Sequence, residues 1–102
     1  MKVSKDINLR VVGVGKVGMS IIQAFAQAGF NVVGMDIDQG NIERGRQLTE
    51  QNLSKLVGKG KIQDEEKATI LSRIELTTEL DRMHDADVII EAVFEDISHH
   101  RI

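Results

Sequence analysis

Three glycines and one aspartate have the spacing most typical of a chemical site in this sequence. Gly13, Gly15 and Gly18 form a G-x-G-x-x-G pattern within the stretch Leu9 to Gly18, LRVVGVGKVG. Asp36 follows roughly 20 residues beyond the glycines. Such glycines are typical of a loop that holds a dinucleotide pyrophosphate, and such a carboxylate accepts hydrogen bonds from ribose hydroxyls. The pattern therefore predicts a dinucleotide site, provided that a strand and a helix flank the glycines.

The residues on either side of the glycines do predict a strand followed by a helix. Leu9, Val11 and Val12 form a short apolar run, which is typical of a parallel strand buried on both faces. The glycines open into a predicted helix, Met19 to Ala28. Apolar residues at steps of three and four form one stripe that is expected to be buried: Val17, Ile21, Ala24, Phe25 and Ala28. Strand, glycine turn and helix is the order that dinucleotide binding requires, because a helix N-terminus attracts phosphate.

Each glycine has its own expected role in this turn. Gly13 permits the tight bend, Gly15 lets the backbone approach a pyrophosphate, and Gly18 lets the helix pack close to the strand. The simpler alternative is that the three glycines form an ordinary structural turn.

Asp36 closes the predicted second strand, Asn31 to Met35, and bears on which dinucleotide binds. A carboxylate at this position accepts hydrogen bonds from both ribose hydroxyls of NAD. It would repel the 2′-phosphate of NADP, and Ile37 follows it instead of an arginine. NAD is therefore the expected cofactor, and the alternative is that Asp36 is a helix cap.

Composition excludes several other classes of protein. The chain has 102 residues, 41% hydrophobic and 28% charged, which is typical of one small globular domain or of part of a larger one. A net charge of -3 and an aromatic content of three phenylalanines argue against a nucleic-acid partner. Cysteine is absent, which excludes disulfides and thiolate chemistry. Without an apolar run of roughly 18 residues or a signal-peptide core, we expect no membrane association and a cytoplasmic location.

A helical hairpin is predicted between the second and third strands. The stretch Asp38 to Asn41 is turn-like and can start a helix. A long helix with one apolar side is expected from Ile42 to Val57, ending near Gly58 to Gly60. A shorter helix begins at the acidic turn Asp64 to Glu66 and reaches about Ser72. The residues expected to face inward are Ile42, Leu48, Leu53, Leu56 and Val57 in the first helix, and Ala68 and Leu71 in the second.

Two further strands complete the expected sheet. Arg73 to Thr78 alternates with period two, which is typical of a strand. A short helical turn or a loop follows at Leu80 to His84, and Ala86 to Phe94 predicts a clearly buried strand. Right-handed crossovers then give about four parallel strands in the order 3-2-1-4, an α/β Rossmann-type half sheet with the hairpin inserted. The last strand is an apolar edge, so we expect either self-association into a homo-oligomer or only marginal stability. Glu95 follows this strand and is placed to face the cofactor.

Four stretches together resemble the 3-hydroxyacyl-CoA dehydrogenases, a family that includes the 3-hydroxybutyryl-CoA dehydrogenases. They are VVGVGKVG, FAQAGFNVVGMDID, LSKLVGKGKIQDEEK and ADVIIEAVFED, and together they cover nearly the whole chain from Leu9 to Asp96. The resemblance implies NAD-dependent oxidation of the 3-hydroxyl of an acyl-CoA in fatty-acid metabolism. It also implies that residues 1–102 are the N-terminal NAD-binding domain and that the helical substrate and dimerisation domain is absent from them.

The resemblance implies particular roles for individual residues. The pyrophosphate is expected at Gly13, Val14, Gly15, Lys16, Val17 and Gly18. Asp36 would hold the adenosine ribose, and Glu95 would hold the nicotinamide side of NAD. Asn52 and Lys59 fall where the family has a serine and a lysine that meet coenzyme A, which makes an acyl-CoA the expected substrate.

The chain also departs from the family pattern. His100 stands where a lysine is expected, and Lys16 stands where a small polar residue is usual. The family's catalytic histidine, glutamate, serine and asparagine lie beyond residue 102, so no catalytic residue is assigned and these residues alone are expected to be inactive. His84, His99 and His100 match no position of that base, and the adjacent pair lacks a third ligand for a metal site. The alternatives are a stand-alone, non-catalytic nucleotide-binding or interaction module and a different NAD enzyme of the same fold.

Overall fold

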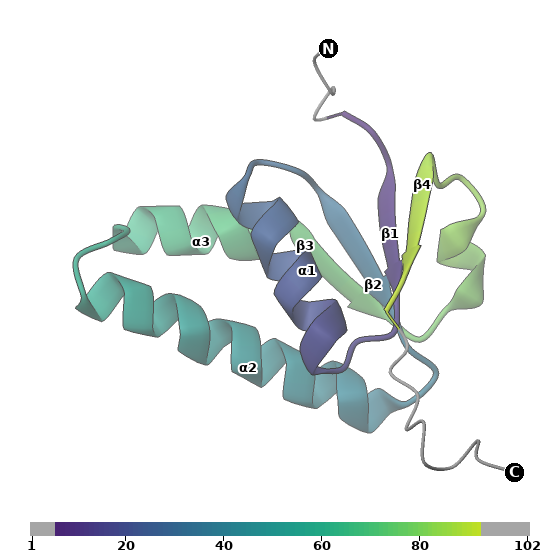
Figure 1. The fold of residues 1–102 in the computed structure, drawn as a ribbon, viewed down its shortest axis with the longest axis horizontal. Helices are drawn as coiled ribbons and strands as arrows, with labels where there is room; N and C mark the ends of the chain where they lie inside the picture. Colours follow the sequence, from purple (N-terminus) through teal and green to yellow (C-terminus); the bar gives the residue numbers. More distant parts are fainter. Residues whose placement is uncertain (1–5, 93–102) are drawn as a thin grey trace, which may run out of the picture.

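The structure is a computed structural model that describes residues 6–92, in which four parallel strands pack against three α-helices (Figure 1). In chain order the elements are β1 (Leu9–Val12), α1 (Lys16–Gln27), β2 (Val32–Met35), α2 (Gln39–Gly58), α3 (Asp64–Ser72), β3 (Ile74–Thr77), the 3-10 helix η1 (Leu80–Met83) and β4 (Val88–Glu91). Each of these elements was predicted. α1 begins at Lys16, earlier than the expected Met19. α2 begins at Gln39, within the stretch Asp38 to Asn41 that can start a helix.

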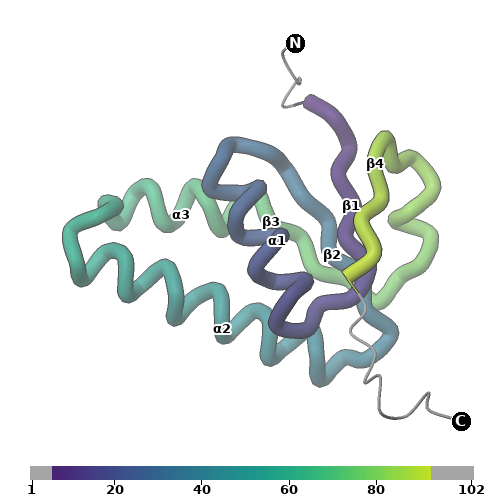
Figure 2. Tube along the Cα trace, in the orientation of Figure 1, coloured from purple at the N-terminus to yellow at the C-terminus, as the bar shows by residue number. Residues whose placement is uncertain are grey.

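The sheet has the strand order β3-β2-β1-β4, which confirms the predicted order. β1 is an inner strand, in which Val12 pairs with Met35 of β2 on one side and with Glu91 of β4 on the other. Figure 2 shows the chain leaving β2 for α2 and α3 before it enters β3, and then crossing through η1 to β4. Because all four strands are parallel, the carboxyl ends of β1, β2 and β4 meet at one edge of the sheet.

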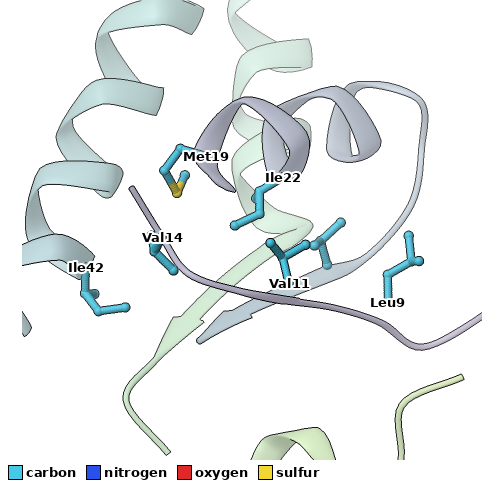
Figure 3. Close-up of a cluster of buried hydrophobic side chains, with 7 residues drawn as sticks. Leu9, Val11, Val14, Met19, Ile22 and Ile42 are labelled. Carbon is cyan, nitrogen blue, oxygen red and sulfur yellow. The ribbon is translucent and has the colours of Figure 1, made fainter. Parts of the chain in front are cut away.

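The main core lies between the sheet and α1 (Figure 3). Its buried residues come from β1, the glycine turn, α1, β2 and α2, and are Leu9, Val11, Val14, Met19, Ile22, Val32 and Ile42. Leu9 and Val11 face this core together because alternate residues of a strand point to the same side. Each large apolar side chain buried here stabilises the contact by about 1.5–3 kcal/mol, so this core holds α1 on the sheet.

The prediction of which side of α1 is buried is wrong, because the helix is rotated about its axis relative to the expected orientation. The buried residues of the helix are Gly18, Met19, Ile22 and Ala26. From the predicted stripe, Ile21 and Phe25 are half-buried, whereas Val17, Ala24 and Ala28 are exposed. The cause is a backbone contact, since a Cβ at Gly18 would lie 1.8 Å from the carbonyl oxygen of Gly13. This approach fixes which side of α1 meets the sheet.

α2 confirms part of its predicted apolar side and corrects the rest. Its buried residues are Ile42, Gly45, Thr49 and Leu53, and the expected Leu48, Leu56 and Val57 are half-buried. Gly45 takes an inner position because a Cβ there would come within 2.8 Å of both Met19 Cγ and Val14 Cγ1. Small residues therefore face inward where α2 passes closest to α1.

α3 completes the hairpin over a second buried cluster made of Ala26, Leu53 and Ile70. Of the residues predicted to face inward, Leu71 is half-buried but Ala68 is exposed, and Ile70 takes the buried position. Lys67 joins the two helices, because its Nζ lies 2.6 Å from Glu50 Oε1 and 2.9 Å from Ser54 Oγ. Along residues 6–92, no helix combines the length and the apolar character needed to cross a membrane.

β4 lies at the edge of the sheet and is less buried than predicted. Val88 is 41% exposed and Ile89 is 51% exposed, while Ile90 alone of the strand is half-buried. Within residues 6–92, β4 pairs with β1 and with no other strand, so much of its surface faces solvent there. The expectation of a clearly buried strand is therefore wrong for this part, and the expectation of an edge strand is confirmed.

We expect Gly18→Ala to lower the free energy of unfolding by about 2–4 kcal/mol, because the new methyl group would collide with backbone atoms of Gly13. Gly58→Ala is the matched control. No atom lies within 4 Å of a Cβ at Gly58, so alanine there should raise stability by up to about 1 kcal/mol. Urea unfolding followed by circular dichroism measures both variants, and equal stabilities would contradict the contact between α1 and the turn.

Candidate functional site

A cleft of about 750 Å³ opens at the carboxyl ends of β1, β2 and β4. Its lining residues are Val12, Gly13, Gly15, Lys16, Val17, Met35, Asp36, Ile37, Asn41 and Ala92. The residues that line the cleft therefore come from the ends of these strands and from the first turns of α1 and α2. This is where open parallel sheets bind ligands, and the volume is that of a small-molecule site.

The glycine turn has the geometry that was predicted from its spacing. Gly13 has a φ of 99°, which bends the chain out of β1, and its N–H donates to the carbonyl oxygen of Met35 of β2 at 2.8 Å. No atom lies within 4 Å of a Cβ placed on Gly15, so the backbone there borders open space on the cleft. Gly18 packs on Gly13 as described above. The three expected glycine roles fit this geometry.

Gly15 is the N-cap of α1 and provides no side-chain cap. The first amides of a helix have no acceptor within the helix, and the helix dipole favours negative charge there. Lys16, the first residue of α1, is exposed on the cleft and adds a positive charge at this end. A pyrophosphate is therefore the kind of group that this end of α1 attracts.

Val14 and Val17, the other two residues of the predicted pyrophosphate loop, face in different directions. Val14 is 1% exposed, and its side chain lies in the main core. Val17 is 51% exposed and lines the cleft. The Val14 side chain thus anchors the glycine turn in the main core, and the Val17 side chain forms an apolar part of the cleft wall.

The Asp36 carboxylate lies at the centre of the hydrogen bonds around the cleft. Its Oδ2 accepts from the Val14 N–H at 2.9 Å and from Asn41 Nδ2 at 3.1 Å, and its Oδ1 accepts from the Asp38 N–H at 2.9 Å. A carboxylate oxygen accepts two hydrogen bonds, so Oδ1 retains capacity for a hydroxyl donor. This is compatible with the predicted role of Asp36 in holding a ribose.

The surroundings of Asp36 keep its side chain ionised. Partial burial of the carboxyl raises its pKa. The hydrogen bonds from Val14, Asp38 and Asn41 and the positive charge of Arg44 lower it by more, so the pKa lies below the ordinary value of 3.8. The helix cap of α2 is Asp38, which accepts from the Gly40 N–H at 2.8 Å. The alternative role of Asp36 as the helix cap is therefore wrong.

The sequence pattern assigned no contact in the site to three residues near Asp36, namely Ile37, Asn41 and Arg44. Ile37 is 88% exposed and lines the cleft, where an apolar side chain suits the face of a flat ring. Asn41 lines the cleft and binds Asp36, and Arg44 donates through Nη2 to Asn41 Oδ1. Helical spacing is the sequence signal that could have identified Asn41 and Arg44, because residues three apart are neighbours on a helix. Both residues lie in the first turns of α2.

The two residues predicted to meet coenzyme A lie on the hairpin. Asn52 is half-buried, with its Nδ2 3.4 Å from Gln23 Oε1 of α1, and Lys59 is the exposed C-cap of α2. Asn52 and Lys59 are seven residues apart, which is about two helical turns, so both lie on one side of α2. Lys59 is 18 residues beyond Asn41, or roughly 27 Å along the helix from the cleft. The structure thus does not bring them into the cleft that Gly15 and Asp36 line.

Glu95 and His100 lie outside the described residues. Within residues 6–92 there is no group of three or more histidine, cysteine, aspartate or glutamate side chains placed to hold a metal ion. The described part of the site therefore consists of the glycine turn, the two helix N-termini and the hydrogen bonds centred on Asp36.

Comparison with known proteins identifies this arrangement. The family model described as "3-hydroxyacyl-CoA dehydrogenase, NAD binding domain" matches residues 8–101. Over 92 residues the chain is 41% identical to a 3-hydroxybutyryl-CoA dehydrogenase of Clostridioides difficile, covering 90% of this chain and 33% of that protein. It is 35% identical over 85 residues to the enzyme of the same name from Bradyrhizobium diazoefficiens, covering 83% of this chain and 29% of that protein.

The fold is also that of a solved structure. The crystal structure of (S)-3-hydroxybutyryl-CoA dehydrogenase from Ralstonia eutropha superposes with a TM-score of 0.83 at 33% identity, covering 91% of this chain and 33% of that one. The chain thus spans about a third of the length of the relatives that it matches. The predicted Rossmann fold and the NAD cofactor are confirmed by the family match. The chain therefore belongs to the 3-hydroxyacyl-CoA dehydrogenase family, as its NAD-binding domain.

Proposed function

We propose that residues 1–102 act as the N-terminal NAD-binding domain of an enzyme that oxidises 3-hydroxyacyl-CoA or reduces the matching 3-ketoacyl-CoA. The observation that carries this proposal is the cleft that Gly15 and Asp36 line together, next to the free amides of α1. In this proposal, the helical substrate and dimerisation domain is polypeptide outside residues 1–102. Family membership and the length of the relatives support this division.

The described residues bind and orient the cofactor. When bound, NAD supplies the nicotinamide ring that accepts hydride from the carbon bearing the 3-hydroxyl. The first amides of α1 and Lys16 hold the pyrophosphate, Asp36 Oδ1 accepts from the adenosine ribose, and Ile37 covers an apolar ring face. Glu95 remains the residue proposed for the nicotinamide side. Oxidation also needs a base within hydrogen-bond reach of the hydroxyl, and we assign that base to residues beyond 102, so residues 1–102 alone should be inactive.

The substrate, location and assembly complete the proposal. The hairpin residues Asn52 and Lys59 meet an acyl-CoA such as acetoacetyl-CoA, and the protein works in fatty-acid metabolism in the cytoplasm. The names of the relatives support the acyl-CoA substrate. We also propose a homo-oligomer, which the exposed apolar residues Val88 and Ile89 on edge strand β4 support.

Calorimetric titration with NAD tests the proposed function. We expect the wild-type chain to bind NAD and Asp36→Ala to bind it about 10-fold to 100-fold more weakly, because the ribose loses a charged acceptor. Circular dichroism shows whether the variant keeps its fold. An unchanged NAD affinity in a folded Asp36→Ala variant would contradict the role of Asp36, and no binding by the wild type would contradict the function itself.

Gly15→Ala serves as a second variant in the same titration. Because no atom lies within 4 Å of the new methyl group, the free energy of unfolding should stay within about 0.5 kcal/mol of the wild type. The methyl group would nevertheless occupy the space through which a pyrophosphate reaches the backbone, so NAD binding should weaken. Weaker binding at unchanged stability separates the site from the fold.

A titration with acetoacetyl-CoA tests the proposed substrate contact. Lys59→Gln should weaken its binding about threefold, because an exposed lysine contributes modestly to the binding of a phosphate group. NAD binding should not change, since Lys59 lies far along α2 from the cleft. The exposed Lys61→Gln is the matched control. If Lys59→Gln and the control bind acetoacetyl-CoA equally well, a nucleotide-binding module without an acyl-CoA site becomes the better interpretation.

The lowered pKa of Asp36 predicts how stability depends on pH. Because the folded-state pKa lies below 3.8, the ionised carboxylate stabilises the fold fully above the unfolded-state pKa, and this contribution is lost as pH falls through the folded-state value. The stability difference between wild type and Asp36→Asn should therefore be constant above about pH 5 and shrink below the ordinary pKa. Urea unfolding at a series of pH values measures it. A difference that stays constant to the lowest pH would contradict the assignment.

A further inference from the structure

We propose that a second pocket, at the amino end of the sheet, binds a small phosphate anion. Its volume is about 280 Å³, and its lining comes from the residues that enter or begin β1, β2 and β3 and from η1. The lining includes three arginines, Arg10, Arg73 and Arg82, and one carboxylate, Glu75. Because the strands are parallel, this arginine pocket lies at the opposite end of the sheet from the cleft (Figure 1). The inference therefore goes beyond the proposed function and does not depend on it.

Arg10 builds one wall of the arginine pocket. It is 5% exposed, which is an unusual place for an arginine. Its Nε donates to the carbonyl oxygen of Arg82 at 2.7 Å, and its Nη2 lies 2.8 Å from Asp85 Oδ1. The Asp85 carboxylate balances the charge of Arg10, and the bond to the backbone of Arg82 holds η1 beside β1. Arg10 thus fixes where the second arginine of the pocket lies.

Arg82 has donors to spare in this position. Its Nη2 donates to Glu75 Oε1 at 2.7 Å. Its Nε is buried and finds no hydrogen-bond partner in the described part of the chain. Glu75 is exposed, so its pairing with Arg82 is screened by water and weak. An anion that enters the pocket can therefore compete with Glu75 for the Arg82 guanidinium.

Arg73 brings a positive charge without a carboxylate partner. Its carbonyl oxygen accepts from the Val32 N–H at 2.9 Å, which places it where β2 and β3 begin. Its Nη1 donates to the carbonyl oxygen of Ala26 in the last turn of α1, and the negative end of that helix offsets part of its charge. Between residues 6 and 92 Arg73 forms no ion pair. A guanidinium has five N–H donors, so most of them stay available to a ligand.

The balance of charge in the arginine pocket favours an anion. The three guanidinium groups face Glu75 within the lining and Asp85 beside it, which leaves one net positive charge in a chain whose net charge is -3. Asp87 accepts from the Asn8 N–H, but it precedes β4, and three strand spacings of the sheet, roughly 14 Å, separate β4 from β3. Charges that far apart are largely screened at physiological salt.

Size and geometry indicate which anion fits. The volume lies just below the range of about 300–1,000 Å³ that is usual for drug-sized ligands, so a nucleotide is too large for the arginine pocket. The planar fork of an arginine matches two oxygens of a phosphate, and a dianion can pair with both Arg73 and Arg82. Inorganic phosphate and a small phosphate monoester share this chemistry.

Amide NMR spectra of the chain, recorded during titration with inorganic phosphate at constant ionic strength, test the site. We expect the largest shifts at the lining residues Asn31, Ser72 and Arg73. Acetate, a monoanion, should bind at least about threefold more weakly than phosphate. Glycerol 3-phosphate separates the two sources of the group: tighter binding than that of phosphate identifies a monoester as the ligand, and weaker binding identifies the free ion.

Two substitutions should change phosphate affinity in opposite directions. Arg73→Met should weaken binding at least about fivefold, because it removes the guanidinium that has no carboxylate partner. Glu75→Gln should tighten binding about threefold, because it removes the charge that competes for Arg82. Arg46→Met is the matched control, since Arg46 is an exposed arginine of α2 outside the arginine pocket. It should keep the wild-type affinity.

The inference is overturned if the phosphate shifts gather at Gly13 and Gly15 of the cleft, or if Arg73→Met and Arg46→Met bind phosphate alike. If Arg73→Met does not fold, Glu75→Gln decides the question, and an affinity no higher than that of the wild type overturns the inference. A wild-type chain that fails to bind NAD contradicts the proposed function and leaves the arginine pocket as argued.

Discussion

The hydrogen bond from the Val14 N–H to the Asp36 carboxylate joins the elements on which the cleft depends. The ladder between β1 and β2 ends at the pair Val12 and Met35. Beyond that pair the two segments separate, one into the glycine turn and the other toward α2. Asp36 spans this divergence, because it accepts from Val14 on one side and from Asp38 and Asn41 on the other. One ionised side chain thus sets the starts of α1 and α2 at a common edge of the cleft.

The order of elements and strands could be predicted because it depends on local patterns and on the handedness of crossovers. Helix rotation could not be predicted from hydropathy. α1 is apolar on most of its circumference, and its buried side is set by the backbone approach of Gly18 to Gly13. On α2 the inner positions include Gly45 and Thr49, which hydropathy ranks below Leu48. Close approach of two helices favours small side chains, and a sequence pattern does not show where that approach occurs.

The difference between local spacing and helix rotation also explains which residues of the candidate site could be predicted from the sequence. Gly13, Gly15 and Asp36 belong to one strand, turn, helix and strand unit, so their spacing along the chain fixes their meeting in space. Asn41 and Arg44 join the site through the start and the rotation of α2, which begins at Gln39, within the turn-like stretch before the expected apolar residues from Ile42. Asn41 then lies in the first turn of the helix and lines the cleft, and Arg44, three residues later, donates to it.

In the proposed function, the charge of Asp36 at this edge serves both the architecture and the choice of cofactor. A helix N-terminus and Lys16 attract any dinucleotide pyrophosphate, so they do not separate NAD from NADP. Discrimination needs a negative charge at the ribose, and that charge is costly to hold among other carboxylates unless donors surround it. In the proposed function, the donors that fix Asp36 also preorganise it for the ribose hydroxyls. The bonds that hold the turn to α2 would then also hold the charge proposed to select the cofactor.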